Sequence, residues 1–346
     1  MYQNEVNEIE FVRNTILVSQ FYKLVELCGD EYPIIPLKGM SLLFSIYKDN
    51  YARNIADIDF FVEEKNVPNL VEKLKSIGYR FRKNHERVNV RLRAKHKFDM
   101  VNFDNRFCDL DIHTNLINKK NFSTSANSFT NFALFRLQPR THNNVKILFL
   151  NPVDEWIYLA QHYCFHFFSN EKWLHDLFLI QNSFSDAEIV ELTTIAKEFH
   201  FERIVTAVSL KLKQQYDSAT IKISELTSIW RSLDFVLSYK PKNKFVHKIL
   251  VIYWRFLFID SKKTRNKAYL KLFSVELNYL ADTYQCNRFV AFLLIPIHLL
   301  LCIFSIFSFL IILNKKIGKI SRIKKRLPEV GNLGIETPCG ASLRAF

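Results

Sequence analysis

Glycine is scarce in this sequence, with 7 glycines among 346 residues against 32 phenylalanines. Glycine-rich phosphate loops and turn-rich all-β folds both depend on glycine, so its scarcity argues against them. The six cysteines include no pair at C-x-x-C spacing, which argues against zinc ribbons and redox motifs and favours buried thiols in a reducing compartment. The N-terminal residues MYQNEVNEIEF are polar and acidic rather than a signal peptide, so we expect a cytoplasmic location.

The composition is that of a folded chain with a basic charge balance. Hydrophobic residues make up 49% and charged residues 24% of the chain, which is unlike an intrinsically disordered protein. The length suffices for two packed units or for one domain with a helical extension. The formal net charge of +14 favours anionic partners such as nucleotide phosphates, nucleic acid or a membrane surface, although a generally basic composition explains it equally well.

The first part of the sequence alternates between helical and extended patterns. Apolar residues recur at helical spacing over 5–28, and Gly29 ends that helix. Further helices are expected at 40–48 and 66–77, and extended segments at 34–37, 57–62, 79–83, 88–103 and 107–116. Because helical and extended segments alternate, we predict an α/β (α+β) fold with a small mixed β-sheet and flanking helices.

From residue 127 onward the pattern is helical. Asn151 followed by Pro152 is typical of a helix start, and Ser185 with Glu188 matches the signature of a capping box. Helices are expected after these two starts, and also at 172–182, 201–216 and 245–285. We therefore predict a core with its N-terminal helix at 1–125, a mostly helical domain at 126–285, and a separate segment at 286–346.

The last of these regions contains an apolar stretch at 289–313 without a formal charge, long enough for the roughly 20 residues of a membrane span. A run rich in lysine and arginine follows at 315–326, which favours an anionic membrane surface. A single span with this basic run in the cytoplasm would place the rest of the chain outside. We therefore expect 289–326 to form a hairpin or an interfacial helix at the inner face of the cytoplasmic membrane. A buried helix pair and a nucleic-acid-binding patch are the alternatives.

Two aspartates stand at alternate positions in the extended segment 57–62. On a strand, Asp57 and Asp59 project from one face while Ile58 points back to the core. Neighbouring carboxylates repel one another unless a cation lies between them, and Mg²⁺ binds carboxylates together with substrate phosphates. A two-metal site needs one more carboxylate from a neighbouring strand, for which Asp109 and Asp111 are the candidates. The alternative is an exposed strand edge, on which such acidic pairs are common.

Lys38 and Gly39 lie at the predicted turn between a strand and a helix. The N-terminus of that helix offers backbone N–H groups to a triphosphate. Lys38 and Ser41 would add a positive charge and a hydroxyl to such a phosphate site.

These residues belong to a recognisable pattern. The segment LKGMSLLFSIYKDNYARNIADIDFFV resembles the signature of the uncharacterised nucleotidyltransferase family, a branch of the polymerase-beta-type nucleotidyltransferase superfamily. The later DLDIHTNL resembles the family's D-h-H block, and HFFSNEKWLHDLFLI resembles its helical W-L-x-D segment. The resemblance covers roughly residues 30–182. Met40 follows Gly39 at a position where the wider superfamily favours glycine or serine.

The resemblance implies an enzyme that moves a nucleoside monophosphate from a nucleoside triphosphate, with ATP the expected donor, to an acceptor hydroxyl and releases pyrophosphate. It implies Mg²⁺ or Mn²⁺ as the cofactor. The implied catalytic and metal-binding residues are Asp57, Asp59 and Asp111. The resemblance implies nucleotide-binding roles for Lys38 and Gly39. Ser41, from its place in the turn, and Arg53 are further candidates for nucleotide binding.

Several of these side chains have simpler structural interpretations. Arg53 is expected to pair with Asp57 and orient it rather than to contact substrate. His113 is expected to donate a hydrogen bond to a neighbouring acid rather than to shuttle protons. Asp176 is expected to have a structural role.

His162 and His166 are spaced for one face of a helix, as in some zinc sites, but no glutamate completes a protease motif in HYCFH. A structural role is favoured for both, and lining the substrate cleft is the other possibility.

A catalytically silent module of the same fold, which binds nucleotide or scaffolds a membrane complex, is the main alternative to an enzyme. Metal-dependent nucleotide turnover distinguishes the two. The net charge also suggests template-independent RNA modification, which predicts steeply salt-dependent RNA binding. No motif identifies the acceptor among small molecules, glycans, proteins and RNA.

Overall fold

The computed structural model describes residues 8–47, 53–81, 97–102, 108–117, 125–166 and 168–216, together with Phe289. The described residues up to 216 fall within one compact unit. The boundaries at 125 and 285 stay predictions, and the helices expected across 245–285 lie outside the described residues. The same is true of the segment 289–326 apart from Phe289. Within the described part of the chain, no helix is long and apolar enough to cross a membrane.

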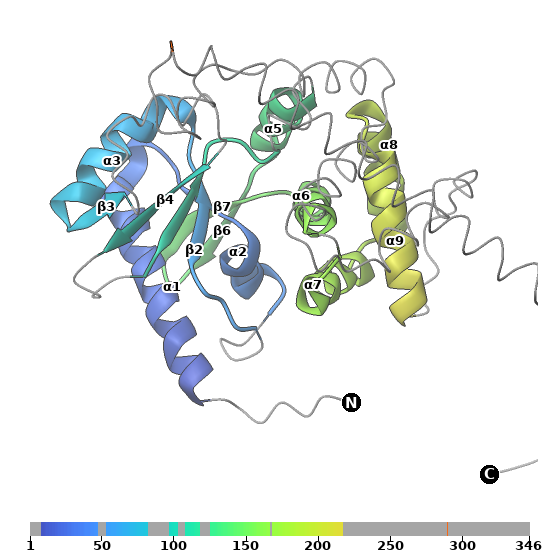
Figure 1. The fold of residues 1–346 in the computed structure, drawn as a ribbon, viewed down its shortest axis with the longest axis horizontal. Helices are drawn as coiled ribbons and strands as arrows, with labels where there is room; N and C mark the ends of the chain where they lie inside the picture. The colour runs from blue at the N-terminus through green and yellow to red at the C-terminus, as the bar shows by residue number, and fades with distance from the viewer. Residues whose placement is uncertain are drawn as a thin grey trace, which may run out of the picture. The chain divides into compact units, whose positions relative to one another are not determined.

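A mixed five-stranded sheet forms the centre of the described structure (Figure 1). Its strands stand in the order β1-β2-β5-β4-β3, and β2 and β5 run parallel while the other neighbours are antiparallel. This confirms the small mixed sheet. The strands are β1 (Ile35–Pro36), β2 (Ile58–Phe61), β3 (Tyr79–Phe81), β4 (Lys97–Asn102) and β5 (Leu110–His113).

One face of the sheet is apolar and carries the main core. Ile58, Phe60, Met100 and Ile112 are fully buried there, together with side chains from α1 (Glu8–Cys28) and α3 (Val67–Ser76). Successive residues of a strand point to opposite faces, so the residues between these apolar positions project from the other face. That second face therefore carries the charged side chains and the histidine of these strands, namely Asp59, Lys97, Asp99, Asp111 and His113.

The two helices of this core end where the sequence predicts. A short 3-10 turn, η1 (Gly29–Glu31), follows α1, and Gly29 has a φ of +61°. Gly78 follows α3 with a φ of 92°. Both glycines hold the left-handed conformation that ends helices at little cost for this residue type. A second 3-10 turn, η2 (Glu64–Asn66), leads into α3.

The helical pattern expected from residue 127 onward is wrong for one stretch. After α5 (Ser125–Phe135) the chain forms an antiparallel hairpin of β6 (Gln138–His142) and β7 (Val145–Phe149). Asn143 and Asn144 make the two-residue turn with φ values of 49° and 64°, the conformation that two-residue hairpins favour and asparagine tolerates. The hairpin packs against β1 through β7.

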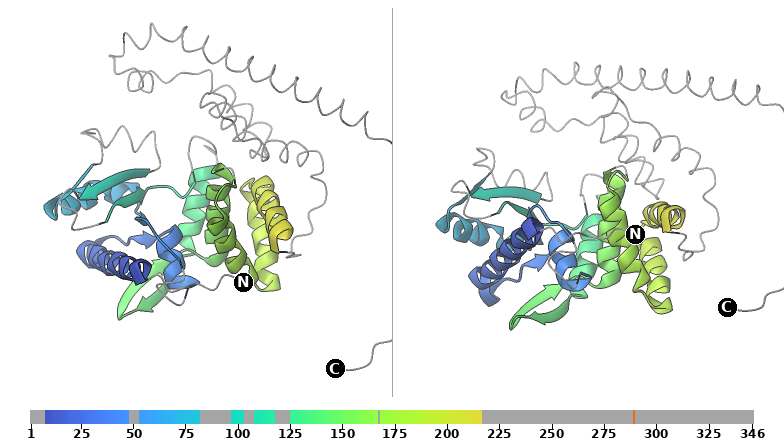
Figure 2. Two further views of the ribbon diagram at one scale, coloured as in Figure 1. Left: turned by 60° about the horizontal axis from the view of Figure 1, so that its bottom comes forward. Right: turned by 90° about the horizontal axis from the view of Figure 1, so that it is seen from below.

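The helices predicted after Asn151 and Ser185 and at 172–182 and 201–216 are confirmed. They lie together beside the sheet in all three views (Figures 1 and 2). Asn151 caps α6 by accepting a hydrogen bond from the Val153 amide at 3.0 Å, and both bonds of the Ser185–Glu188 capping box are present. The helices are α6 (Pro152–Phe165), α7 (Glu171–Asn182), α8 (Asp186–Glu198) and α9 (Glu202–Tyr216).

Candidate active site

The pairing of β2 with β5 brings two aspartates from distant parts of the chain together. Asp59 stands directly opposite Asp111 in the parallel ladder, and both lie on the polar face of the sheet. They are 5% and 7% exposed, so little water screens their mutual repulsion. Two carboxylates in this position need positive charge beside them.

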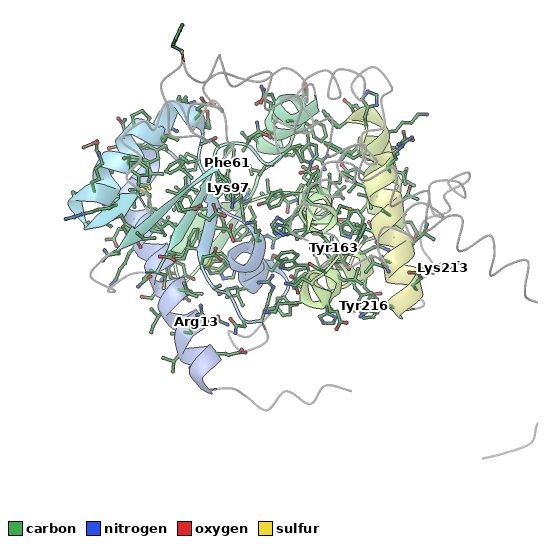
Figure 3. All side chains as sticks on the ribbon, viewed as in Figure 1. Arg13, Phe61, Lys97, Tyr163, Lys213 and Tyr216 are labelled. Carbon is green, nitrogen blue, oxygen red and sulfur yellow. The ribbon has the colours of Figure 1, made fainter. Side chains whose placement is uncertain are left out.

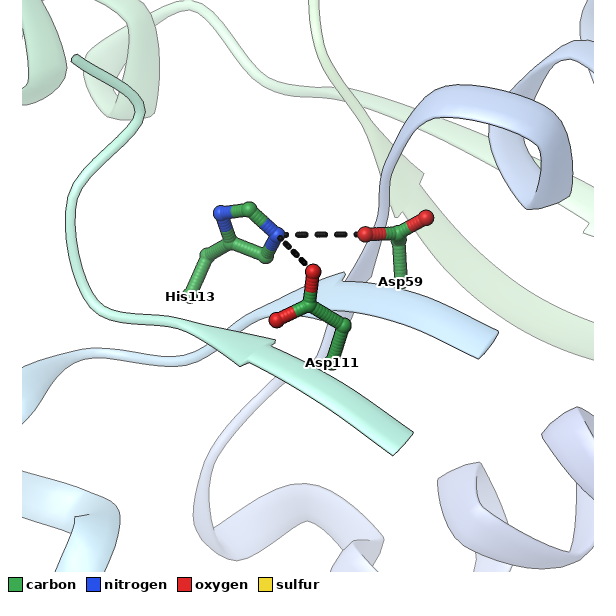
Figure 4. Close-up of side chains that lie close together, drawn as sticks. All are labelled: Asp59, Asp111 and His113. Atoms are coloured by element: carbon green, nitrogen blue, oxygen red, sulfur yellow. Dashed lines mark hydrogen bonds and ion pairs between the residues drawn. The ribbon is translucent and has the colours of Figure 1, made fainter. Parts of the chain in front are cut away.

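His113 faces both carboxylates from the end of β5 (Figure 4). Its Nε2 atom lies 3.2 Å from Asp59 Oδ1 and 3.4 Å from Asp111 Oδ2. The expected contact between His113 and a neighbouring acid is therefore confirmed. Oxygen atoms of Asp59 and Asp111 and a ring nitrogen of His113 all lie within 4.8 Å of one another, a grouping that could hold a metal ion.

Two lysines supply positive charge. Lys38 Nζ lies 2.5 Å from Asp59 Oδ1 and 3.5 Å from Asp111 Oδ2, and Lys97 Nζ lies 2.5 Å from Asp111 Oδ2. Burial alone would raise the pKa of Asp111, but His113, Lys38 and Lys97 hold that pKa well below its ordinary value. Burial would lower the pKa of Lys38, but its neighbours, among them Asp59 and Asp111, raise that pKa above its ordinary value. Both shifts favour the charged forms, the carboxylate of Asp111 and the ammonium of Lys38.

Lys97 was not identified from the sequence. It lies on β4 directly opposite His113, and it is labelled in Figure 3. The alternation of Lys97 and Asp99 with the apolar Phe98 and Met100 is the signal that places Lys97 on the polar face. Without the strand order, that alternation does not say which residues it faces.

Asp57 precedes β2 and belongs to the same electrostatic group. Burial, and next the charge of Asp59, raise the pKa of Asp57 to about 6. Asp111 raises this pKa further, whereas Lys38 and Lys97 lower it. Its role as a metal ligand stays a prediction.

The other candidate carboxylate, Asp109, has a different environment. It acts electrostatically on Tyr79 and Cys108, and its backbone carbonyl accepts a hydrogen bond from the Ile58 amide at 3.0 Å. Asp111 is therefore the residue of this pair that joins Asp59.

The turn before α2 (Lys38–Ser45) is held against β2, because the Leu37 amide donates to the Asp59 carbonyl at 2.9 Å. Lys38 has a φ of 50°, a left-handed conformation that costs a non-glycine residue about 1–2 kcal/mol. Such strain is typical of functional sites, and here it accompanies the contact of the Lys38 ammonium with two carboxylates.

Gly39 and Ser41 lie deeper in the same helix. A β-carbon at Gly39 would lie 2.3 Å from both Arg53 Nη1 and Ile55 Cγ2, so the loop before β2 packs directly on this glycine. Ser41 is fully buried. Burial raises the pKa of Glu155 to about 7, and the Ser41 hydroxyl acts in the opposite direction and lowers that pKa. The nucleotide-binding roles of Gly39 and Ser41 stay predictions.

The expected pairing of Arg53 with Asp57 is wrong. Arg53 Nε donates to both carboxylate oxygens of Asp176, at 2.9 and 3.0 Å, and Nη2 donates to Oδ2 at 2.7 Å. Tyr47 also donates to Asp176, at 2.7 Å. Asp176 thus has the expected structural role, and it ties α7 to the loop that leads into β2.

Helix α6 forms a wall beside the carboxylates. Tyr158 is buried, and its ring centroid lies 6.3 Å from that of His113. Burial raises the pKa of Tyr158, and the charges of Lys38, Asp59 and Asp111 also influence that pKa. Its hydroxyl has no hydrogen-bond partner within the described structure. Tyr158 was missed in the sequence, although it lies four residues before His162 and therefore on the same helix face.

His162 and His166 pack with Trp173. Ring centroids lie 4.5 Å apart for His162–His166 and His162–Trp173, and 5.0 Å apart for His166–Trp173. Burial, followed by the charges of Lys38 and His166, lowers the pKa of His162 well below its ordinary value. This packing favours the structural interpretation of the pair, and lining of the substrate cleft stays the alternative.

A protein-family model described as an uncharacterised nucleotidyltransferase matches residues 6–216 of this chain. The matched region contains every side chain discussed in this section. No curated protein is similar enough to the chain to count as a match.

Proposed function

The chain belongs to the uncharacterised nucleotidyltransferase family, and from this premise we propose that it transfers a nucleoside monophosphate from a nucleoside triphosphate to an acceptor hydroxyl. The observation that supports this most directly is the side-by-side placement of Asp59 and Asp111 on one buried polar face, with Asp57 in the same electrostatic group. Pyrophosphate is the other product, and ATP is the proposed donor.

The side chains fit a divalent cation. Asp111 Oδ1 is buried and has no hydrogen-bond partner in the described structure, and the donor set of carboxylate oxygens is the one that Mg²⁺ and Mn²⁺ favour. Asp57, Asp59 and Asp111 would hold the cation. When bound, it would stabilise negative charge on the phosphates and increase the acidity of the attacking hydroxyl.

The protein's own groups would position the donor and accept a proton. Lys38 brings a positive charge to the N-terminal end of α2, where backbone N–H groups favour a phosphate. The acceptor oxygen forms a bond to the α-phosphorus, and the bond from that phosphorus to the bridging oxygen of pyrophosphate breaks. The hydroxyl proton passes to a carboxylate of the group, and Asp57, which precedes β2 and is less buried than Asp59 and Asp111, is the proposed base.

The test is nucleotide turnover by the full chain. Each labelled triphosphate is supplied with Mg²⁺ or Mn²⁺ and a cell extract as the source of acceptor, and pyrophosphate release and label transfer are followed. Asp59→Asn and Asp111→Asn should each abolish transfer, whereas the matched control Asp109→Asn should retain it, because Asp109 lies beside Tyr79 and Cys108. Equal loss in all three variants, or turnover that survives Asp59→Asn, would contradict the proposed site.

One observation favours the silent module as a second candidate. The Lys38 ammonium already bridges Asp59 and Asp111 and partly neutralises them without a metal. Nucleotide binding by a folded chain that never releases pyrophosphate with any triphosphate or acceptor would support this second candidate over the enzyme.

A further inference from the structure

His113 approaches two carboxylates through a single atom. Nε2 lies 3.2 Å from Asp59 and 3.4 Å from Asp111, and the side chain is 3% exposed. A ring nitrogen carries at most one hydrogen, so one N–H cannot make a full-strength hydrogen bond to both oxygens at once. A cation bound between the nitrogen and the two oxygens would contact all three atoms at once.

The spacing of the three atoms suits such a cation. Bonds of about 2.1 Å to a small divalent ion place adjacent ligands of an octahedron about 3.0 Å apart. The observed separations from Nε2 are within a few tenths of an ångström of this value, and the three ligand atoms all lie within 4.8 Å of one another.

Two further observations point to a bound cation at this place. The ammonium of Lys38 already lies 2.5 Å from Asp59 Oδ1 and 3.5 Å from Asp111 Oδ2, so the two oxygens attract positive charge. The buried Tyr158 hydroxyl has no hydrogen-bond partner in the described structure, and the Tyr158 ring centroid lies 6.3 Å from that of His113. A bound cation would take the place of the ammonium between the carboxylates.

We propose that His113 Nε2 is a direct ligand of the cation held by Asp59 and Asp111, which makes this a mixed nitrogen and oxygen site that prefers Mn²⁺ to Mg²⁺. Imidazole nitrogen is a favourable ligand for transition metals, whereas Mg²⁺ keeps to oxygen. This inference rests on the proposed function, because it concerns the same metal. It differs from the interpretation in which His113 only donates a hydrogen bond to an acid.

The decisive experiment is pulsed electron paramagnetic resonance on the full chain loaded with one equivalent of Mn²⁺. The wild-type protein should show coupling of the manganese electron spin to a ¹⁴N nucleus, and His113→Gln should lose it. The matched control His162→Gln should keep the coupling, because His162 packs against His166 and Trp173. The ratio of Mn²⁺ to Mg²⁺ affinities, measured by calorimetry, should fall at least about tenfold in His113→Gln.

A second measurement covers the case in which His113→Gln does not fold. Wild-type protein grown with ¹⁵N-histidine should show the ¹⁴N coupling replaced by ¹⁵N coupling. Bound Mn²⁺ without nitrogen coupling, or no Mn²⁺ binding at all, would overturn the histidine ligand. Nucleotide turnover is measured separately: turnover without nitrogen coupling rejects only the ligand, and nitrogen coupling without turnover rejects only the transferase.

Discussion

Breaking the ion pair between Arg53 and Asp176 should be among the most destabilising single changes in this region, because it leaves a buried charge without its partner. The two side chains are 6% and 1% exposed, and three hydrogen bonds of 2.7–3.0 Å join them. Asp176→Ala would leave the guanidinium buried without its partner. Removal of one member of such a pair costs about 3–5 kcal/mol. We therefore expect the free energy of unfolding to fall by about that amount.

Urea unfolding of the full chain, followed by circular dichroism, measures this loss. The control is Glu63→Ala, which breaks an ion pair with Lys65 whose side chains are 45% and 72% exposed. Exposed pairs of this kind contribute about 0–1 kcal/mol. If Asp176→Ala costs no more than Glu63→Ala, then the Arg53–Asp176 pair does not hold α7 to the loop before β2, and this reasoning is refuted.

Two more predictions follow from local packing and burial. Gly39→Ala should destabilise the protein by about 1–3 kcal/mol, because a β-carbon would lie 2.3 Å from Arg53 and Ile55 side-chain atoms. The control is Gly29→Ala, whose β-carbon would meet no atom within 4 Å but whose φ of +61° costs an alanine about 1–2 kcal/mol. In thermal melts Gly39→Ala should lower the stability at least as much as Gly29→Ala. A Gly39→Ala protein as stable as the wild type would show that the loop before β2 moves away easily. Burial raises the pKa of Asp154 to about 7, so folding takes up a proton and this group's contribution to stability decreases as pH rises from about 4 to about 7. Asp154→Asn should remove that slope from the pH dependence of urea midpoints, and an unchanged slope would contradict it.

Local patterns in the sequence determined much of the fold. The apolar period over 5–28 predicted α1, and the capping signals at Asn151 and Ser185 predicted where α6 and α8 begin. These features were readable because each depends on residues within a few positions of one another. The hairpin at 138–149 was missed, because a two-residue asparagine turn between short strands gives a weaker signal than the helical patterns around it.

The candidate site was only partly readable. The spacing of Asp57 and Asp59 predicted a shared strand face, whereas β2 begins at Ile58 and contains only Asp59; the family resemblance selected Asp111. The parallel register that sets Asp59 opposite Asp111 is a property of the sheet. Lys97 and Tyr158 reach this group only because β4 and α6 pack where they do.

The partner of Arg53 shows most clearly how a local prediction from the sequence differs from the contact in the folded chain. The sequence placed this arginine four residues before Asp57 and suggested a local pair, but the structure pairs it with Asp176, 123 residues away. Periodicity, caps and the spacing of carboxylates are local, so the sequence by itself determined the helices, most of the strands and the acidic motif. Strand order and helix packing decide which charges pair in a buried site. A buried charge is costly unless an opposite charge lies within hydrogen-bond distance, whatever its position in the sequence. That choice was made by the tertiary structure alone.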